Sequence, residues 1–325
     1  MRRTFTLCNL SLLLAFAAGT TSAQTEKPAS ASTTGGDSAT TVRTAMRNVD
    51  YHLTDRIIVN ITSLNGRLTP KPGEIPVFDD KNSFGLDVDS AKITLTMTAL
   101  TNDLNDYVFA KPDAPLKKLI ASIQGDQIVM KGILISKGGI PFGTSGTMSV
   151  TSEGMIHVHT TKVTALHLPV KGLMDLLGLD TQKMLNTKKV EGVSADKDDL
   201  VLDPEKLLPP PQLHGHLTSL KIENGVIDLT FGPEMGKVAS APISESCSAR
   251  NYLHFKGGSV RFGRLTMSDT DLELVDASPA DPFDFAIDHY NEQLMAGYSK
   301  MTRTGGLCVH MPDYDKLKQP AIVKK

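Results

Sequence analysis

The chain has 325 residues, and its 34 Lys and Arg against 36 Asp and Glu give a formal net charge of −2. It carries no basic tail and no run in which basic and aromatic residues alternate, which argues against a nucleic-acid-binding protein. Beyond the N-terminal segment, no stretch approaches the roughly 20 apolar residues that a membrane-spanning helix needs.

The N-terminus has the order of features that defines a secretion signal. Arg2 and Arg3 form a positive start, Leu10–Ala18 is almost wholly apolar, and Thr21–Ala23 offers the small residues that a signal peptidase reads. We therefore expect residues 1–23 to be a cleaved signal peptide, and the mature chain to be periplasmic or secreted. A retained N-terminal anchor is the alternative.

Three cysteines bear on the redox state of the chain. Cys8 leaves with the signal, so the mature chain keeps Cys247 and Cys308. Two cysteines in an oxidising compartment most simply pair, and we predict a disulfide between them. The alternative is a catalytic thiol at Cys308 with His310 as its base.

Composition divides the mature chain into three parts. Residues 24–46 are rich in Ser, Thr, Ala and Gly and predict a disordered linker. Residues 47–235 predict the main folded domain, and residues 236–325 predict a C-terminal extension of a β-hairpin and a helix that packs on the same domain.

Alternation of apolar residues predicts several strands. Ile128–Ile135 is apolar on both faces, so we expect structure on each side of it. The clearest hairpin spans Leu217–Phe231, where Asn224-Gly225 suits a tight turn with positive φ angles. A second hairpin is expected over Val260–Val275, turning near Ser268-Asp269.

Three segments have helical spacing. The first is capped by Thr98 and carries Leu100, Leu104 and Val108 on one side. The second runs from Pro169 to Gly178. The third repeats Phe283, Ile287, Tyr290 and Leu294 and stops at Gly297. Because strands dominate and helices are few, the predicted class is α+β, with a largely antiparallel sheet.

Candidate catalytic groups are scattered and carry no recognisable motif. Two histidine pairs, His157/His159 and His214/His216, have the spacing of a metal-binding strand, but no third ligand stands at a telling distance. An aspartate group lacks the glycine and glutamate of a calcium loop; its members are Asp269, Asp271, Asp276, Asp281, Asp284 and Asp288. We expect no metal, no cofactor and no enzymatic activity, with a metal-dependent hydrolase as the less favoured alternative.

Two blocks of sequence resemble a known group of proteins. Ile93–Gly232 contains "ITLTMTALTNDLNDYVF" and ends in "QLHGHLTSLKIENGVIDLTFG", and Asn251–Tyr314 begins with "NYLHFKGGSVRFGRLTMSDTDLELVDA" and ends in "GGLCVHMPDY". They resemble an uncharacterised family of exported bacterial proteins. That family is similar to the mycobacterial periplasmic lipid-binding proteins of lipomannan elongation and to the tubular lipid-binding superfamily. The resemblance implies a curved antiparallel sheet that wraps a helix and encloses an apolar groove.

This resemblance, together with the apolar pattern, predicts a binding protein for a lipid or another hydrophobic ligand in the cell envelope, with the envelope membrane surface as a second partner. The alternative is a structural or interaction component of the envelope with a filled core. The expected wall of the groove comes from two helices and the doubly apolar strand, namely Leu100, Leu104, Ile128, Met130, Leu173, Met174 and Leu177.

Overall fold

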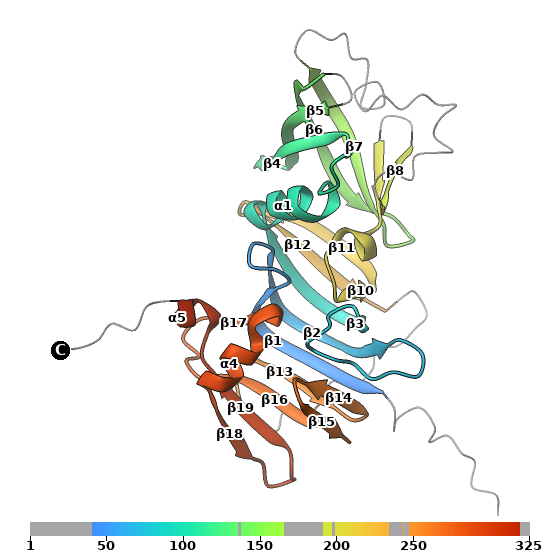
Figure 1. The fold of residues 1–325 in the computed structure, drawn as a ribbon. Coiled ribbons are helices and arrows are strands. Elements are labelled where there is room, and N and C mark those ends of the chain that lie inside the picture. Colours follow the sequence, from blue (N-terminus) through green and yellow to red (C-terminus); the bar gives the residue numbers. More distant parts are fainter. Residues whose placement is uncertain are drawn as a thin grey trace, which may run out of the picture. The chain divides into compact units, whose positions relative to one another are not determined.

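The computed structural model describes residues 41–135, 138–165, 191–196, 199–233, 243 and 247–318. These residues form a mostly antiparallel β structure with few helices, which confirms the predicted fold class (Figure 1). The described strands lie in a large sheet, a second sheet that we call the inserted sheet, and a small hairpin.

The large sheet has 11 strands, and its main path runs β11-β12-β3-β2-β1-β13-β16-β19-β18. Two short strands join off this path, β10 parallel to β3 and β17 parallel to β1. The strands are β1 (Val42–His52), β2 (Ile58–Pro70), β3 (Phe84–Thr96), β10 (Gln212–His214), β11 (His216–Glu223), β12 (Val226–Gly232), β13 (Tyr252–Lys256), β16 (Asp271–Asp276), β17 (Phe283–Ala286), β18 (Tyr298–Met301) and β19 (Leu307–Met311).

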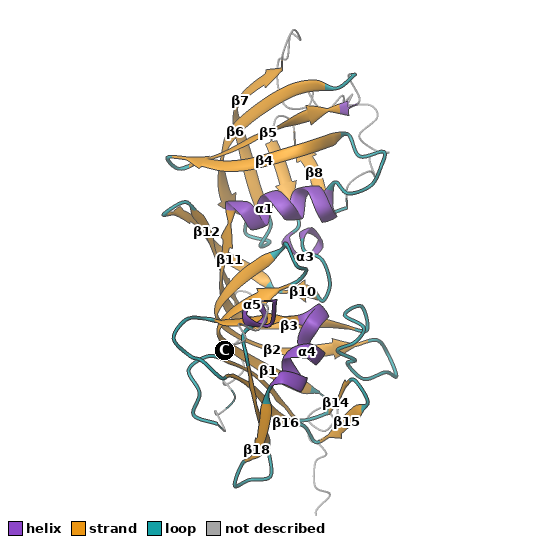
Figure 2. Ribbon diagram, turned by 60° about the vertical axis from the view of Figure 1, so that its left-hand side comes forward, coloured by secondary structure: helices purple, strands orange, loops and turns teal. Residues whose placement is uncertain are grey.

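The inserted sheet is built from residues that lie between β3 and β10 in the sequence. Its order is β4-β5-β6-β7-β9-β8, and every pairing in it is antiparallel. The strands are β4 (Leu116–Gln124), β5 (Gln127–Leu134), β6 (Ile140–Val150), β7 (Ile156–Ala165), β8 (Val193–Asp196) and β9 (Asp199–Leu202). In Figure 2 the first helix lies alongside this sheet, next to β4.

The small hairpin consists of β14 (Ser259–Phe262) and β15 (Leu265–Ser268). The helical segments are short: α1 (Met97–Asp103), η1 (Leu104–Val108), α3 (Pro204–Leu207), η4 (Ile287–His289), α4 (Tyr290–Ala296) and α5 (Tyr314–Lys318). With so few helices, most backbone groups of the described residues find their partners in sheet ladders.

The folded part begins earlier than its composition indicated. β1 starts at Val42, inside the segment expected to be a linker, and Ala45 and Met46 are buried. Strand β1 pairs with β2 on one side and with β13 on the other, so its small polar residues gain ladder bonds that composition does not reveal. The same pairing joins the C-terminal extension directly to the large sheet.

The β11–β12 hairpin confirms the predicted Asn-Gly turn. Glu223 pairs with Val226, and the two residues between them have positive φ angles, 50° at Asn224 and 79° at Gly225. Two positive φ angles in a two-residue loop define the primed turn whose twist matches that of the flanking strands.

We expect Gly225→Val to lower the free energy of unfolding by about 1–2 kcal/mol, because a β-branched residue resists positive φ. A Cβ at this position would meet no atom within 4 Å, so the loss comes from the backbone conformation and not from a clash. Urea denaturation measures it. Asn224→Gly is the control, since it keeps positive φ and should leave stability near that of the parent; equal loss in both variants would contradict the turn assignment.

Two other local predictions are wrong. The hairpin after Val260 turns at Gly263-Arg264, because Phe262 pairs with Leu265, and β16 pairs with β13 instead. The expected helix from Phe283 begins as strand β17, in which Phe283 and Phe285 are both fully buried. Burial of alternate residues is the strand period, so the apolar pattern belongs first to a strand and then, from Ile287 onward, to the short helices η4 and α4.

Candidate ligand-binding site

The first helix begins at a different cap from the one expected. Thr96, in extended conformation, accepts a hydrogen bond from the Ala99 backbone N–H at 3.1 Å, so Thr96 and not Thr98 is the N-cap. α1 then continues into η1, which carries Leu104 and Val108. The continuous helical segment thus contains Leu100, Leu104 and Val108, the three apolar residues that the sequence placed on one side of a helix.

Side chains on α1 and η1 bond to the edge strand of the inserted sheet. Asn105 accepts from the Leu119 backbone N–H at 2.9 Å and donates to the Leu119 carbonyl at 2.8 Å. Thr101 accepts from the Ala121 backbone N–H at 3.0 Å. β4 is the terminal strand in the order of this sheet, and a bulge shifts its register next to Leu119. These bonds satisfy backbone groups of an edge strand and hold the helix against the sheet.

A row of side chains runs across one face of the inserted sheet, starting at β4, the edge strand that bonds to the helix. Ala121, Met130, Thr144 and Val163 lie opposite one another in register across β4, β5, β6 and β7. Ala121 is buried, whereas the other three are only partly buried. The row is therefore buried at Ala121, beside α1, and its side chains keep some accessible surface on β5, β6 and β7.

The apolar residues of this region form a cluster of their own. Its buried members are Phe109, Ala114, Leu116, Leu119, Leu134 and Phe142, and the partly buried residues packed against it are Leu104, Val108, Met130, Val163, Ala165 and Leu200. A close-packed interior leaves few voids between its side chains. Here half of the participants keep accessible surface, which is the condition for a ligand to cover them.

The structure divides the predicted wall residues that it describes between two apolar clusters. Leu104 and Met130 pack against this cluster. Leu100 and Ile128 instead join the larger core cluster, most of whose buried members lie on the large sheet. Leu173, Met174 and Leu177 lie outside the described residues.

Sequence reasoning missed Val163 and Leu200, which pack against the same cluster. Val163 alternates with exposed Lys162 and Thr164 at the strand period, and extending the predicted strand that starts at Ile156 would have found it. Leu200 lies on a strand of four residues, too short for periodicity to mark.

Asp103 is a buried acid on α1. Its side chain is 3% exposed, and its Oδ1 has no hydrogen-bond partner in the described part of the chain. Burial, and then repulsion by Asp106, raise the pKa of Asp103 to about 8. The carboxyl group is therefore mainly protonated and neutral at pH 7, so the buried side of the helix carries no full charge.

Two open hollows lie beside the segment that enters β10, and both are lined by Pro210 and Gln212. One holds about 170 Å³ and is bordered by Tyr107, Glu191 and Lys206. The other holds about 250 Å³ and is bordered by Lys71, Lys81 and His214. Both fall below the roughly 300–1,000 Å³ of a site for a drug-sized ligand, and charged groups line both. Neither has the character of an acyl-chain site.

The histidine pairs have carboxylate partners. His157 Nε2 and His159 Nδ1 lie 3.1 and 2.8 Å from the two carboxylate oxygens of Asp199 on β9. Although burial works in the opposite direction, hydrogen bonds from His159 and from the Thr160 backbone lower the pKa of Asp199. His214 lies 3.1 Å from Glu205. His157, His159 and His214 thus have an ordinary electrostatic explanation.

The aspartate group is dispersed among separate partners. Asp276 accepts from Asn251 at 2.9 Å, Asp288 binds Lys81 at 2.7 Å, and Asp284 binds His52 and the Asp315 backbone. Among the described residues, no group of three or more His, Cys, Asp or Glu side chains could hold a metal ion. Nothing in this part of the chain positively indicates an enzyme.

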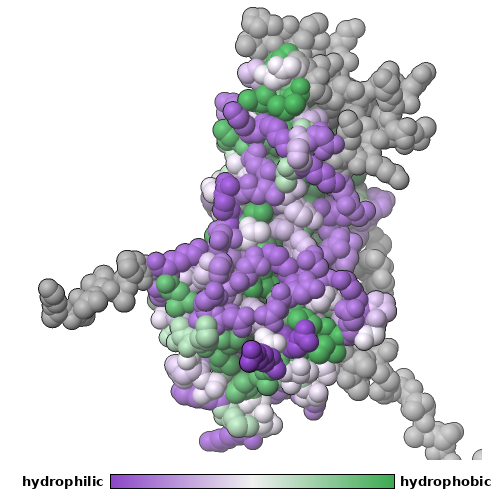
Figure 3. All heavy atoms as spheres, in the orientation of Figure 1, coloured by the Kyte–Doolittle hydropathy of each residue, from purple (hydrophilic) through white to green (hydrophobic). Residues whose placement is uncertain are grey.

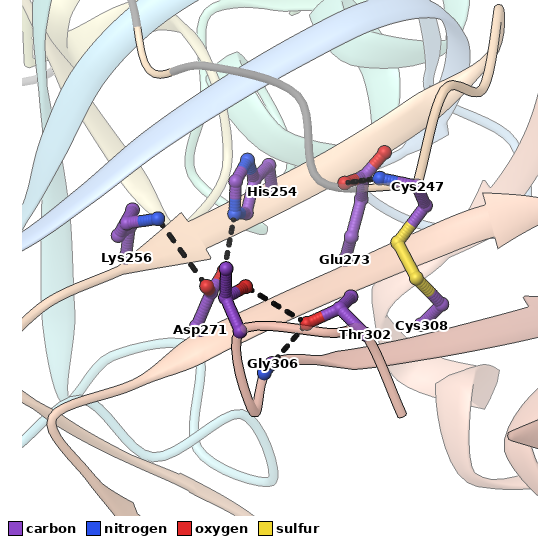
Figure 4. Close-up of a disulfide and its surroundings, with 9 residues drawn as sticks. Cys247, His254, Lys256, Asp271, Glu273, Thr302, Gly306 and Cys308 are labelled. Atoms are coloured by element: carbon purple, nitrogen blue, oxygen red, sulfur yellow. Dashed lines mark hydrogen bonds and ion pairs between the residues drawn. A yellow bond between two sulfur atoms is a disulfide. The ribbon is translucent and has the colours of Figure 1, made fainter. Parts of the chain in front are cut away.

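The predicted disulfide is confirmed. Cys247 and Cys308, 61 residues apart, are bonded, with Cα atoms at 6.1 Å (Figure 4). The Cys247 backbone N–H donates to Glu273 at 3.0 Å, and Glu273 lies between His254 and Cys308 in the strand register. The bridge therefore ties the segment before β13 to β19, and it removes Cys308 as a free nucleophile.

No protein-family model, curated protein or solved structure matches this chain.

None of the helices in the residues described has the length and apolar content required to span a bilayer.

Proposed function

We propose that this chain is an exported, non-enzymatic binding protein that holds a lipid or another hydrophobic ligand on the face of the inserted sheet that carries Met130 and Val163. The observation that carries the proposal is the set of partly buried apolar side chains, Met130, Val163 and Leu200, beside a helix bonded to the sheet edge. When the chain covers an apolar face incompletely, binding of a hydrophobic ligand to the rest is favourable, because it removes apolar surface from water.

The polar groups of the region favour a neutral environment for such a ligand. Protonation of Asp103 leaves the buried side of α1 uncharged, and the partly buried Thr144 is the uncharged polar member of the row that contains Met130 and Val163. Methionine at position 130 is flexible and polarisable, so it adapts to tails of different shape. These features suit an acyl chain better than a charged metabolite.

Export is the second component of the proposal. The N-terminal 23 residues have the composition of a secretion signal, and the bridge between Cys247 and Cys308 suits an oxidising compartment. A periplasmic or secreted carrier would exchange its ligand with the membranes of the cell envelope, which makes the envelope surface its second partner.

The chain contains no tryptophan, so a single introduced tryptophan reports on this site alone. We expect Met130→Trp, after removal of co-purified lipid, to transfer excitation energy saturably to a bound polyene fatty acid. Leu265→Trp is the control, because Leu265 is 54% exposed on β15 of the small hairpin. It should show no saturable transfer.

Native mass spectrometry of the freshly purified parent protein gives an independent readout, since a carrier retains lipid through purification. Absence of bound lipid and of fatty-acid uptake, together with a loss of about 1–3 kcal/mol of stability from overpacking in Met130→Trp, would identify an ordinary packed core. The chain would then be a structural or interaction component of the envelope without a ligand.

A further inference from the structure

The large sheet ends in a short strand whose outer edge is open. β18 pairs with β19 from Tyr298 opposite His310 to Met301 opposite Leu307. No other strand of the described residues lies beside it, and all four of its residues are exposed. Among the described residues, its outer backbone N–H and C=O groups therefore have no ladder partner, which is the arrangement that accepts an additional strand.

Exposed apolar side chains surround this edge. Met301 is 76% exposed, Tyr298 is 53% exposed, and Met295 on the neighbouring α4 is 80% exposed. Because side chains alternate along a strand, Tyr298 and Lys300 lie on one face and Ser299 and Met301 on the other. Figure 3 shows apolar surface in the part of the molecule that carries α4 and β18. Both faces of the edge thus present apolar surface for a partner to cover.

An added strand fits these features better than a lipid surface does. Lipid tails offer nothing to hydrogen-bond the open backbone groups, whereas a strand satisfies them in series. A strand also places its own side chains over both faces of the edge, where Tyr298 and Met301 lie. The partner therefore has to be a polypeptide in extended conformation.

The sequence of β18 suits pairing with itself. Two identical antiparallel strands related by a two-fold axis keep each residue on the same face, so one residue must lie opposite its own copy. Within this strand the axis falls at Ser299 or at Lys300. Centring on Lys300 sets two ammonium groups on directly opposed residues, about 4.5–5.5 Å apart at Cβ, and like charges in that position destabilise a sheet.

Centring on Ser299 removes this conflict. Lys300 of each copy then lies opposite the ring of Tyr298, and the two lysines become diagonal neighbours at about 7–8 Å. Within one chain the Lys300 ammonium already lies 5.2 Å from the Tyr298 ring centroid, so the two side chains are compatible. Met301 comes opposite Gly297, which has no side chain to obstruct it.

We propose that β18 is a homodimer interface, in which two copies of this chain pair their β18 strands antiparallel with Ser299 at the two-fold axis. Pairing joins the two large sheets edge to edge and buries Met295, Tyr298 and Met301 of both copies. This interface is independent of ligand binding, because it uses none of the residues of the inserted sheet.

Sedimentation velocity of the parent protein across a concentration series tests the dimer. Met295→Ser/Met301→Ser should weaken self-association at least about tenfold, because four large apolar side chains return to water. Ile120→Ser is the matched control, since Ile120 is 59% exposed on the inserted sheet. It should leave the dimer unchanged.

Cysteine cross-linking tests the register. In the Ser299→Cys variant, the two introduced thiols at the axis lie within the about 4.4–6.8 Å Cα separation that a disulfide requires. Under mild oxidation this variant should form a covalent dimer at least about tenfold faster than Thr304→Cys, an exposed site on the same hairpin outside the paired region. Thermal melts confirm that each variant is folded.

A parent protein that stays monomeric throughout the series would overturn the proposal, as would equal cross-linking rates at the two sites. If the monomer instead sediments with vesicles containing anionic lipid and the double serine variant does not, the edge is a membrane contact and the dimer assignment is wrong.

Discussion

Replacing both Cys247 and Cys308 with serine lowers the free energy of unfolding by about 4 kcal/mol in the chain-entropy description of a disulfide. The bridge closes a segment whose ends are 61 residues apart, which contains β13 and β16 and ends in β19. Without it, the unfolded chain gains the conformations that the closed loop forbids. A loss of this size is a large fraction of the stability of a typical domain.

Urea denaturation with and without reductant measures the effect. Reductant should lower the stability of the parent protein to that of the double serine variant and leave the variant unchanged. Thiol titration of the unfolded, unreduced parent should find neither Cys247 nor Cys308 reactive. Two reactive thiols, or a variant as stable as the parent, would contradict the assignment.

Asp103→Asn makes the protein more stable, and the gain depends on pH. Burial raises the pKa of Asp103 to about 8, against about 3.9 in an unfolded chain. Between these values the folded state binds more protons than the unfolded state, so the free energy of unfolding falls as pH rises. The contribution of the neutral acid is complete below about pH 4 and is lost by about pH 8.

The asparagine variant lacks this titration, so its advantage over the parent should grow through that window by at most about 1.4 kcal/mol per pH unit. Above pH 8 the advantage should be constant. Urea denaturation at pH 5, 6, 7 and 8 follows it. Asp126→Asn, at an exposed turn, is the matched control and should track the parent. Parallel profiles for the parent and Asp103→Asn would show that Asp103 titrates normally in the folded protein.

Local chemistry made parts of the fold predictable. The Asn224-Gly225 turn depends on two neighbouring residues that tolerate positive φ, and the paired strands follow from it. The turn signal at Ser268-Asp269 is also genuine, because Asp269 has a φ of 51°. It marks the passage from β15 to β16, however, and not a hairpin. Local propensity identifies where a chain bends, but the pairing partner is decided by tertiary contacts.

The candidate site shows the same division. The spacing of Leu100, Leu104 and Val108 identified the helix, but a helical pattern does not state which cluster each residue joins. Leu100 packs with the larger core and Leu104 with the smaller one, and the helical segment bonds to β4 next to a bulge. That bulge depends on a positive φ at Lys118, a residue type that gives no sequence signal for it.

The pairing of β1 with β13 sets the order in which the large sheet can be completed. A chain leaves both the ribosome and an export channel with its N-terminus first, so β1 and β2 emerge before Tyr252–Lys256. At usual elongation rates the roughly 200 residues between His52 and Tyr252 take about 10–40 s to synthesise. During that interval the backbone N–H and C=O groups on the β13 side of β1 have no strand to pair with, although β1 lies in the middle of the completed sheet. The incomplete chain is then most exposed to wrong pairing with other chains.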